Sequence, residues 1–323
     1  MTASDSKRIA LIGAGFIGKH LIRNLLRGGY RLFILDRNAC PAEFFGRLDW
    51  VQGDFHDRTK LDQVLTGADL VYHLVSSTVP GDLHVDVARE LHENVVGSLS
   101  VIDACVTHGI RRLVFASSAS VYGVQERFPV GEDAPTWPIS AHGIHKLAIE
   151  KFLWLAQREH GLEVRIIRLA NPYGPGQSIT GRQGFVAITI GCLLRSETLT
   201  LRDGGRMVRD FIYVEDVAEA LAAVGIRDGL PQILNIGAGQ GHSLVEVVNL
   251  IEHFTGRKLK IADAPPRLVD IPVSVLDVAM AKQAFGFAPR TPLRAGLELT
   301  LAAVAQEAGG KLRSPAVKLE AGR

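Results

Sequence analysis

Short runs of Val, Ile and Leu alternate with longer helical patterns through the first half of the chain. The short apolar runs predict strands and the longer patterns predict helices. The expected strands are Arg8–Ile12, Arg31–Leu35, Leu70–Leu74, Arg112–Ser117 and Glu163–Leu169, and the expected helices are Gly15–Leu26, Val87–Thr107 and Ala141–Glu159. This alternation predicts an α/β fold of the Rossmann type, a doubly wound parallel sheet with helices on both faces.

The alternation weakens from Asn171 onward, where Gly, Pro and basic residues become denser. We therefore expect residues 1–170 to form the Rossmann domain and residues 171–308 a smaller C-terminal α/β substrate-binding region. The strand Gln232–Ile236 is expected to return to the main sheet. The weakly patterned segment Gly309–Arg323 predicts a loose, flexible tail.

Composition narrows the class of protein. The 323 residues are 47% hydrophobic and 22% charged, which is typical of a soluble globular protein with one large or two closely joined domains. A net charge of +2 without a basic tract argues against a nucleic-acid or membrane-surface role. The scattered Cys40, Cys105 and Cys192 match neither a disulfide framework nor a metal site and suit a reducing compartment.

Targeting signals are not recognised in the chain. The polar start Met1–Lys7 runs directly into a strand and does not resemble a signal peptide. The longest apolar run, near Gly184–Leu194, is too short to span a bilayer and predicts a buried helix. The sequence therefore predicts a cytoplasmic protein without a metal site.

A glycine-rich turn, Gly13-Ala14-Gly15-Phe16-Ile17-Gly18, follows the first strand and opens a helix. Gly13 permits the tight turn, Gly15 lets the backbone approach a pyrophosphate, and Gly18 permits close packing of helix and strand. The helix N-terminus then offers unpaired N–H groups to the phosphates. The pattern predicts a dinucleotide site, and the plainer alternative is a structural glycine turn followed by a solvated Asp.

The end of the second strand bears on which dinucleotide binds. Asp36 follows Gly18 by 18 residues, where a carboxylate binds both ribose hydroxyls and repels a 2′-phosphate. NAD is therefore favoured over NADP, although the neighbouring Arg37 could accommodate a phosphate.

Further segments resemble those of a known family. Its adenine pocket is similar to Gly53-Asp54-Phe55. Its [VI]-[IF]-H-[LF]-A segment is similar to Tyr72-His73-Leu74-Val75, and its N-V-x-G-T motif is similar to Asn94-Val95-Val96-Gly97-Ser98. To about residue 302 the chain resembles an extended short-chain dehydrogenase of the NAD-dependent epimerase/dehydratase family, nearest to the UDP-glucose 4-epimerase group. Ile12 departs from the family, which usually has an additional glycine there.

The resemblance implies an NAD cofactor held by the segments that match. The implied cofactor-binding residues are Gly13, Gly15, Phe16, Ile17, Gly18, Asp36, Arg37, Asp54, Phe55, Leu74, Val75, Ser76, Asn94, Ser117, Lys146 and Pro172.

The segment Phe115–Gly123 resembles the family's F-S-S-S-A-T-V-Y-G, so Ser118 is implied as a catalytic and substrate-binding hydroxyl. The related dehydratases have T-D-E and the decarboxylases T-S-E at this place, because elimination and decarboxylation use an additional acid or base. This chain has Ala119 and Ser120. The resemblance therefore favours oxidation and re-reduction of one carbinol over loss of water.

The segment Ser140–Lys146 resembles the family's S-P-Y-G-x-S-K, but His142 occupies the place of the catalytic tyrosine. None of the five tyrosines precedes a lysine by four residues. His142 and Lys146 are one helical turn apart, so both can face the cofactor. Imidazole is a competent base near neutrality, but it is shorter than phenol and would need a bridging water. The alternative is a helix-face histidine with no proton role.

Two further motifs imply a binding site for a nucleotide sugar. Arg168–Gln177 resembles R-x-x-N-x-Y-G-P-x-Q, and Val208–Val217 resembles V-R-D-[YF]-I-[YH]-V-x-D-V. Two guanidinium groups suit a diphosphate because they neutralise and orient it. With a weaker R-x-G-D match at Arg267–Asp270, the implied substrate-binding residues are Ser118, Asn171, Gln183, Arg209, Arg267 and Asp270.

Three functions follow as hypotheses. The first is an NAD-dependent 4-epimerase of a UDP-sugar that passes through a 4-keto intermediate, with Ser118, His142 and Lys146 as the catalytic set. The second is a catalytically silent protein that binds NAD and a sugar nucleotide, and the third is a 4-ketoreductase or dehydrogenase. By resemblance, the helices Val87–Thr107 and Ala141–Glu159 would form a homodimer, although burial within the monomer is an open alternative.

Overall fold

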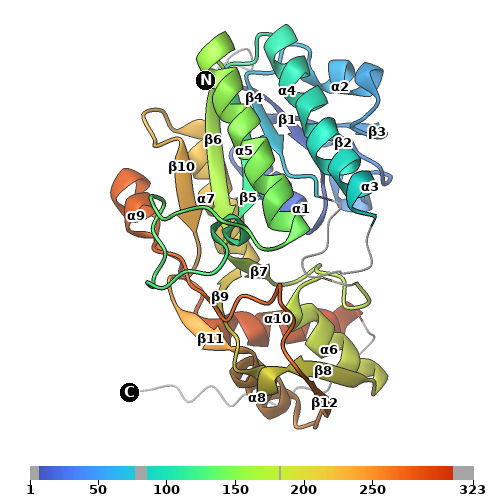
Figure 1. Cartoon of the computed structure of the whole chain (residues 1–323). Helices are drawn as coiled ribbons and strands as arrows, with labels where there is room; N and C mark the ends of the chain where they lie inside the picture. The colour runs from blue at the N-terminus through green and yellow to red at the C-terminus, as the bar shows by residue number, and fades with distance from the viewer. Residues whose placement is uncertain (1–6, 77–85, 182, 308–323) are drawn as a thin grey trace.

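The computed structural model describes residues 7–76, 86–181 and 183–307. A seven-stranded parallel sheet forms its centre, in the order β10-β6-β5-β4-β1-β2-β3 (Figure 1). The strands are β1 (Arg8–Ile12), β2 (Arg31–Asp36), β3 (Asp49–Gln52), β4 (Leu70–His73), β5 (Arg112–Ser118), β6 (Glu163–Leu169) and β10 (Ile233–Ile236). The predicted doubly wound parallel sheet is confirmed, and the returning strand pairs with β6 at the sheet edge.

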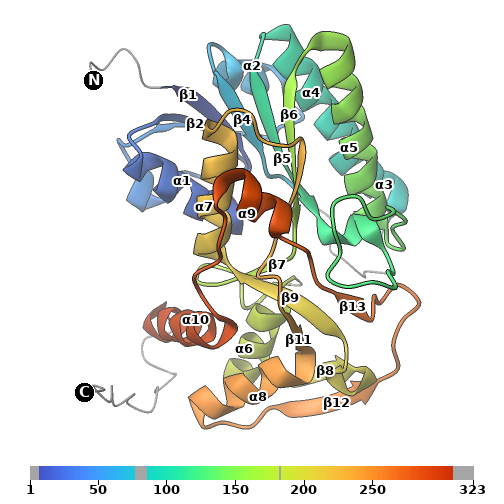
Figure 2. The same cartoon turned by 90° about the vertical axis from the view of Figure 1, so that its left-hand side faces the viewer.

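Helices cover both faces of this sheet (Figures 1 and 2). One face carries α2 (Arg58–Leu65), α4 (Gly97–Thr107) and α5 (Ala141–His160), and the other carries α1 (Phe16–Arg27), α7 (Val214–Ile226) and α9 (Ala279–Phe285). Side chains of β1 alternate between the two cores, with Ile9 and Leu11 on the α1 side and Ala10 and Ile12 on the α5 side. A strand buried on both faces explains the unbroken apolar run in the sequence.

The predicted helix Val87–Thr107 is interrupted by a π-helical turn. The chain runs through α3 (Val87–Leu91), the π-turn His92–Val96 and then α4. Within the turn, Asn94 Nδ2 donates to Glu90 O at 2.8 Å, and Ser98 Oγ donates to Asn94 O at 2.6 Å. Such turns occur frequently at functional sites, and this one contains the predicted cofactor residue Asn94.

The helix α7 packs on the same face of the main sheet as α1, although the two helices are far apart in the sequence. It packs beside α1, and its Gly225 has no room for a side chain, since a Cβ would lie 2.0 Å from Tyr72 Oη. The Tyr72 hydroxyl donates to Leu221 O at 3.2 Å. The sequence analysis did not predict α7, α2 or β3, because β3 is short and half-polar and the two helices lie outside the recognised alternation.

A smaller α/β unit follows the main sheet (Figure 2). It contains one four-stranded and one two-stranded sheet and three helices around its own core. These elements are β7 (Asn171–Tyr173), α6 (Phe185–Arg195), β8 (Thr198–Arg202), β9 (Val208–Tyr213), β11 (Gly241–Ser243), α8 (Leu244–Thr255), β12 (Lys260–Ala264), β13 (Val273–Ser274) and α10 (Leu293–Glu307). The segment Gly309–Arg323, predicted as a tail, lies outside the described residues. Within the described part, every helix is too short or too polar to cross a membrane.

Candidate active site

The glycine-rich turn between β1 and α1 forms one wall of a pocket at the carboxyl edge of the sheet. Gly13 has φ of +97°, and a Cβ there would lie 2.8 Å from Val75 Cγ2. A Cβ on Gly18 would lie 2.3 Å from Gly13 O, whereas a Cβ on Gly15 would meet no atom within 4 Å. Gly13 and Gly18 are therefore required by the protein's own packing, and Gly15 opens toward the pocket.

The N-terminus of α1 adjoins this opening. Gly15 is the N-cap residue and provides no side chain to satisfy the first N–H groups of the helix. Backbone N–H groups and the helix dipole together form an anion-binding site. The cradle fits the pyrophosphate of a dinucleotide.

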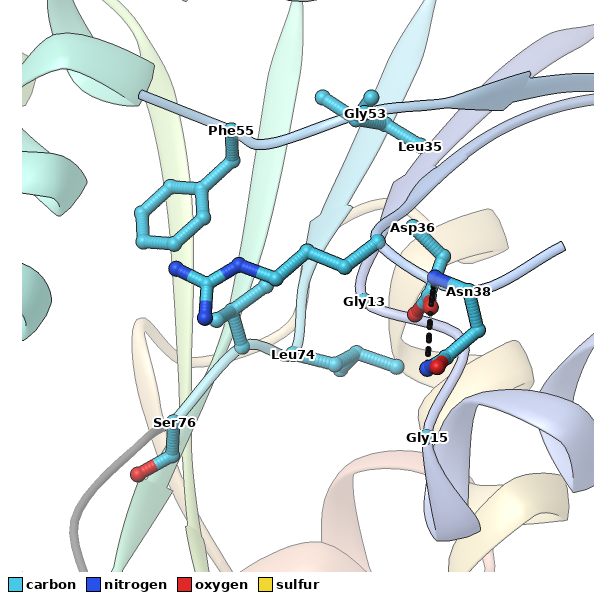
Figure 3. A pocket seen from close by; sticks show the side chains of 11 residues that line it. Gly13, Gly15, Leu35, Asp36, Asn38, Gly53, Phe55, Leu74 and Ser76 are labelled. Carbon is cyan, nitrogen blue, oxygen red and sulfur yellow. Dashed lines mark hydrogen bonds between the residues drawn. The ribbon is translucent and has the colours of Figure 1, made fainter. Parts of the chain in front are cut away.

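The pocket has a volume of about 250 Å³ and extends from the glycine turn toward β2, β3 and the segment after β4. Its lining residues are Gly13, Gly15, Leu35, Asp36, Arg37, Asn38, Gly53, Phe55, Leu74, Val75 and Ser76. Figure 3 shows Asp36 and Asn38 on one side of the pocket and Phe55 on the other. Eight of the sixteen predicted cofactor residues line this pocket, and Leu35, Asn38 and Gly53 line it as well.

Asp36 is held in place by the turn it faces. Its Oδ2 accepts from Ala14 N at 2.7 Å, and its Oδ1 accepts from Asn38 N at 2.8 Å and from Asn38 Nδ2 at 2.9 Å. Arg37 is directed to Asp54, with Nε and Oδ2 2.9 Å apart. The guanidinium that could attract a 2′-phosphate is thus neutralised by a carboxylate, which favours NAD.

Ser118 ends β5 and caps the following 3-10 turn, Ala119–Tyr122. Its Oγ accepts from Ser120 N at 3.2 Å and from Ser120 Oγ at 3.0 Å. Because Ser118 Oγ accepts twice, its own hydrogen remains to be donated. Ser120 was considered in the sequence only as a marker of reaction type, and its contact with Ser118 was not anticipated.

The start of α5 lies directly against this turn. A Cβ on Gly143 would be 2.6 Å from Ser120 O, so the helix approaches as closely as its backbone permits. Lys146 is buried, and its Nζ donates to Ala116 O on β5 at 2.7 Å. Burial lowers the pKa of Lys146 to about 8, opposed by the nearby Glu150 carboxylate. The structure therefore brings Ser118 and the His142–Lys146 segment to one place.

His142 is neutral in this environment. Burial, the positive charge of Lys146 and the neighbouring His145 lower its pKa to about 3. For a tyrosine, the proton-accepting form is an anion, which a lysine stabilises. For a histidine, the proton-bound form is a cation, which the same lysine opposes. Lys146 therefore opposes the uptake of a proton by His142, whereas it would favour the ionised, proton-accepting form of a tyrosine.

Glu150 is a residue that the sequence analysis missed. It accepts from Ser117 Oγ at 2.5 Å and forms a buried ion pair with Arg168 at 2.8 Å. These contacts join α5 to the ends of β5 and β6, which precede the predicted catalytic and sugar-nucleotide segments. Glu150 could have been found from its spacing, because positions 142, 146 and 150 are four residues apart and share one helix face.

The predicted sugar-nucleotide residues come from neighbouring strands and one loop. Asn171 Nδ2 donates to Asp210 O at 3.1 Å, and Arg209 Nη1 donates to Val208 O at 2.8 Å. Arg267 pairs with Asp270 at 2.7 Å. Burial lowers the pKa of Arg209, and the Asp270 charge opposes that change.

Gln183 is exposed just before α6, and Pro172 lies in β7. Among the described residues, His, Cys, Asp and Glu do not gather in threes in a manner suited to a metal ion.

The profile of the NAD dependent epimerase/dehydratase family matches residues 9–237. The chain belongs to this family. It is 32% identical over 313 residues to the UDP-glucose 4-epimerase of Azospirillum brasilense, a match covering 90% of this chain and 89% of that protein. The family is NAD-dependent, and the residues of the pocket fit that cofactor.

Solved structures of family members resemble the whole fold. A UDP-glucose 4-epimerase from Thermotoga maritima, solved with UDP-glucose, has a TM-score of 0.86 and 30% identity, covering 93% of this chain and 99% of that one. A dTDP-glucose 4,6-dehydratase from Streptomyces venezuelae, solved with NAD bound, has a TM-score of 0.87 and 25% identity, covering 94% and 98%. Similar members of the family thus catalyse different reactions, and the comparisons establish an enzyme family rather than one reaction.

Proposed function

We propose that this protein is an NAD-dependent 4-epimerase of a UDP-sugar with an impaired catalytic base. The observation that carries the proposal is the junction of β5 and α5, where Ser118 and the His142–Lys146 segment meet beside a dinucleotide pocket. The similarity to UDP-glucose 4-epimerases over most of the chain supports a sugar-nucleotide substrate.

The pocket residues would hold NAD by the glycine turn, the α1 N-terminus and the Asp36 carboxylate. When bound, NAD supplies a reversible acceptor for the hydride of the sugar C4. Ser118 donates its hydroxyl hydrogen to the sugar O4, and neutral His142 accepts the O4 proton, through one water where the ring does not reach. Lys146, with two N–H groups beyond the one on Ala116 O, binds the nicotinamide ribose.

Epimerisation is favoured over dehydration by the residues after Ser118. Ala119 is buried and apolar, and Ser120 is bonded to Ser118. Neither supplies a carboxylic acid or carboxylate beside the reacting carbon. The residues directly after Ser118 therefore offer a 4-keto sugar no acid or base for the loss of water, which favours rotation and renewed reduction.

A catalytically silent binding protein is the second candidate, and one observation favours it. A histidine with a pKa of about 3 holds a proton too weakly to be an effective base at neutral pH. The cofactor pocket, Asn171 and Arg209 do not depend on proton transfer. In that case NAD and the sugar nucleotide would bind without turnover.

One experiment decides between the candidates. The purified protein is incubated with NAD and UDP-galactose, and UDP-glucose is measured beside the variants His142→Ala and Ser118→Ala. The 4-epimerase proposal expects slow conversion that both variants abolish. UDP-galactose binding by calorimetry without conversion supports the silent binding protein instead. Conversion that survives in both variants would contradict the assigned catalytic set.

We also propose a homodimer formed by α3 and α5. Their exposed apolar side chains include Val87, Leu91, Phe152, Trp154 and Leu155, each at least 40% exposed. Large apolar side chains left exposed on two helices favour an interface over a surface that faces solvent. Light scattering after gel filtration should give twice the monomer mass, and Phe152→Asp should give the monomer. A monomeric wild type would contradict the assignment.

A further inference from the structure

Asp210 lies in β9, directly after the predicted substrate residue Arg209, and its side chain is fully buried. The strand β9 stands between the main sheet and the smaller unit (Figure 2), where it pairs with β7, β11 and β13. A carboxylate shielded from water must find its hydrogen-bond donors within the protein. The donors around Asp210 therefore show what this side chain holds together.

The Asp210 carboxylate accepts hydrogen bonds from two separate segments of backbone. Its Oδ1 accepts from Ala238 N at 2.7 Å, and its Oδ2 accepts from Gly239 N at 3.1 Å and from Leu276 N at 3.3 Å. The first two donors belong to the loop after β10, the returning strand of the main sheet, and the third follows β13. A Cβ on Gly237 would lie 2.3 Å from Oδ2, so the loop backbone lies directly against the carboxylate. One side chain thus ties β9 to both units of the fold.

The backbone of Asp210 also contacts the predicted sugar-nucleotide site. Asn171 Nδ2 donates to Asp210 O at 3.1 Å. Arg209 is the preceding residue of the same strand, and neighbouring side chains of a strand point to opposite faces. The carboxylate therefore fixes β9 from one face, while Arg209 leaves the strand on the other. The positions of Asn171 and Arg209 both depend on where β9 is held at Asp210.

The charged groups around Asp210 come from β9, β11 and the segment after β13. On β9 the charged neighbour is Arg209. On β11, His242 lowers the pKa of Asp210, and its Nδ1 lies 2.8 Å from Glu246 Oε1 at the start of α8. After β13, Asp277 follows the donor Leu276, and its Oδ1 accepts a backbone N–H at the start of α9 at 2.8 Å. The side chains of β7 and of the loop after β10 carry no charge.

Burial raises the pKa of Asp210 from 3.8 to about 6, opposed by the three backbone hydrogen bonds and by His242. At pH 7.5 the group is therefore ionised and accepts all three bonds. At pH 5 most molecules carry a proton on this carboxyl group. Its hydrogen then faces backbone N–H groups, which cannot accept it, and the remaining bonds lose the assistance of the charge.

We propose that the Asp210 carboxylate is a positioning residue that locks β9 to the loop after β10 and to the segment after β13, and so holds Asn171 and Arg209 in place for a sugar nucleotide. Ionised Asp210 maintains this lock, and protonated Asp210 loosens it. The affinity for the sugar nucleotide therefore falls as pH falls. This inference rests on the proposed function, because Asn171 and Arg209 are assigned to the substrate there.

Binding is tested by calorimetric titration of the NAD-loaded protein with UDP-glucose, whose diphosphate diester stays fully ionised from pH 5 to 7.5. The wild type should lose about tenfold in affinity over this range, in proportion to the ionised fraction of Asp210. Asp210→Asn should bind about tenfold more weakly than the wild type at pH 7.5, because its NH2 group would face backbone N–H donors. Its affinity should then be the same at pH 5. An Asp210→Asn variant with wild-type affinity at pH 7.5, or with the wild-type decline, would overturn the inference.

Two variants separate Asp210 from its surroundings. Asp216→Asn is the matched control, because Asp216 is also buried and accepts two backbone N–H groups, from Arg290 and Thr291, but holds the segment before α10. It should bind UDP-glucose as the wild type does at each pH. His242→Gln should keep the decline, displaced toward higher pH, because a charge that lowers the pKa of Asp210 is gone. Loss of the decline in His242→Gln would assign it to the histidine and contradict the inference.

Two further measurements do not require that Asp210 be replaced. Gly237→Ala should weaken UDP-glucose binding at pH 7.5, because its Cβ would displace the carboxylate without removing the charge. In the NAD-loaded wild type, the side-chain amide of Asn171, identified by its absence in Asn171→Ser, should shift in nitrogen NMR with a midpoint near pH 6. An amide signal that does not move between pH 5 and 7.5 would overturn this inference alone. A wild type that binds no UDP-glucose at any pH would overturn the proposed function and this inference with it.

Discussion

Replacement of His142 by tyrosine should increase the rate of 4-epimerisation. The environment lowers the pKa of His142 from 6.5 to about 3, which opposes the imidazolium by about 5 kcal/mol. If the proton is half transferred in the transition state, about half of this opposition, roughly 2.5 kcal/mol, is added to the barrier. That is roughly a 70-fold loss of rate.

Tyrosine reverses the sign of this effect. Its base form is an anion, so the buried Lys146 ammonium would favour it, and a phenol reaches farther from the helix than an imidazole. We expect kcat for conversion of UDP-galactose to UDP-glucose to rise by about 10- to 100-fold in His142→Tyr, with little change in KM. The rate should also increase with pH until Lys146, with a pKa of about 8, loses its charge.

The assay follows UDP-glucose by a coupled dehydrogenase at saturating NAD from pH 6 to 9. His108→Tyr is the matched control for introducing a phenol, because His108 ends α4 away from the pocket, and its rate should equal that of the wild type. The reasoning is refuted if His142→Tyr is folded and binds UDP-galactose but converts it no faster than the wild type.

Three further predictions concern the pocket and its supports. Gly15→Ala should weaken NAD binding by at least tenfold in a fluorescence titration without lowering Tm, because its Cβ would meet no protein atom. Gly18→Ala should lower the free energy of unfolding in urea by about 1–3 kcal/mol, because its Cβ would collide with Gly13 O. Equal destabilisation by the two variants would contradict this. Glu150→Ala should cost about 3–5 kcal/mol of unfolding free energy in urea by leaving buried Arg168 without its carboxylate, and a loss below about 1 kcal/mol would argue against the network. Burial holds the pKa of His73 near 3, below its ordinary 6.5. The contribution of the neutral ring to the free energy of unfolding is therefore complete above pH 6.5 and should fall by roughly 3 kcal/mol from there to pH 4. His73→Phe should lack that part of the decline in urea unfolding, and an unchanged pH dependence in this variant would refute the prediction.

The sequence predicted the strands and helices whose local hydrophobic pattern matches the way they are buried in the fold. β1 and β6 have the expected bounds, and α5 differs by one residue, because apolar runs buried on both faces and a helix with a clear cap leave little choice. The interruption at His92–Val96 was not predicted, since one additional residue in a helical turn leaves the apolar pattern nearly unchanged. The helix α7 was missed because its place depends on packing against α1, far away in the sequence.

The sequence predicted part of the lining of the cofactor pocket, but not the electrostatics of the candidate site. The glycine turn and Asp36 were read from their spacing, and the structure places them around one pocket. The spacing of His142 and Lys146 showed a shared helix face, but not that burial and a neighbouring charge would oppose protonation of the ring. Such effects depend on how many atoms surround a group, which no sequence motif specifies.

The pairing of β10 with β6 has a consequence for how the chain is made. Between these adjacent strands lie β7, β9 and α7, so the last strand of the nucleotide-binding sheet is synthesised more than sixty residues after its neighbour. On the ribosome, the edge of β6 stays unpaired until Ile236 has emerged from the exit tunnel. An exposed strand edge invites pairing with other chains, so a ribosome that stalls in this interval would release a fragment prone to aggregate.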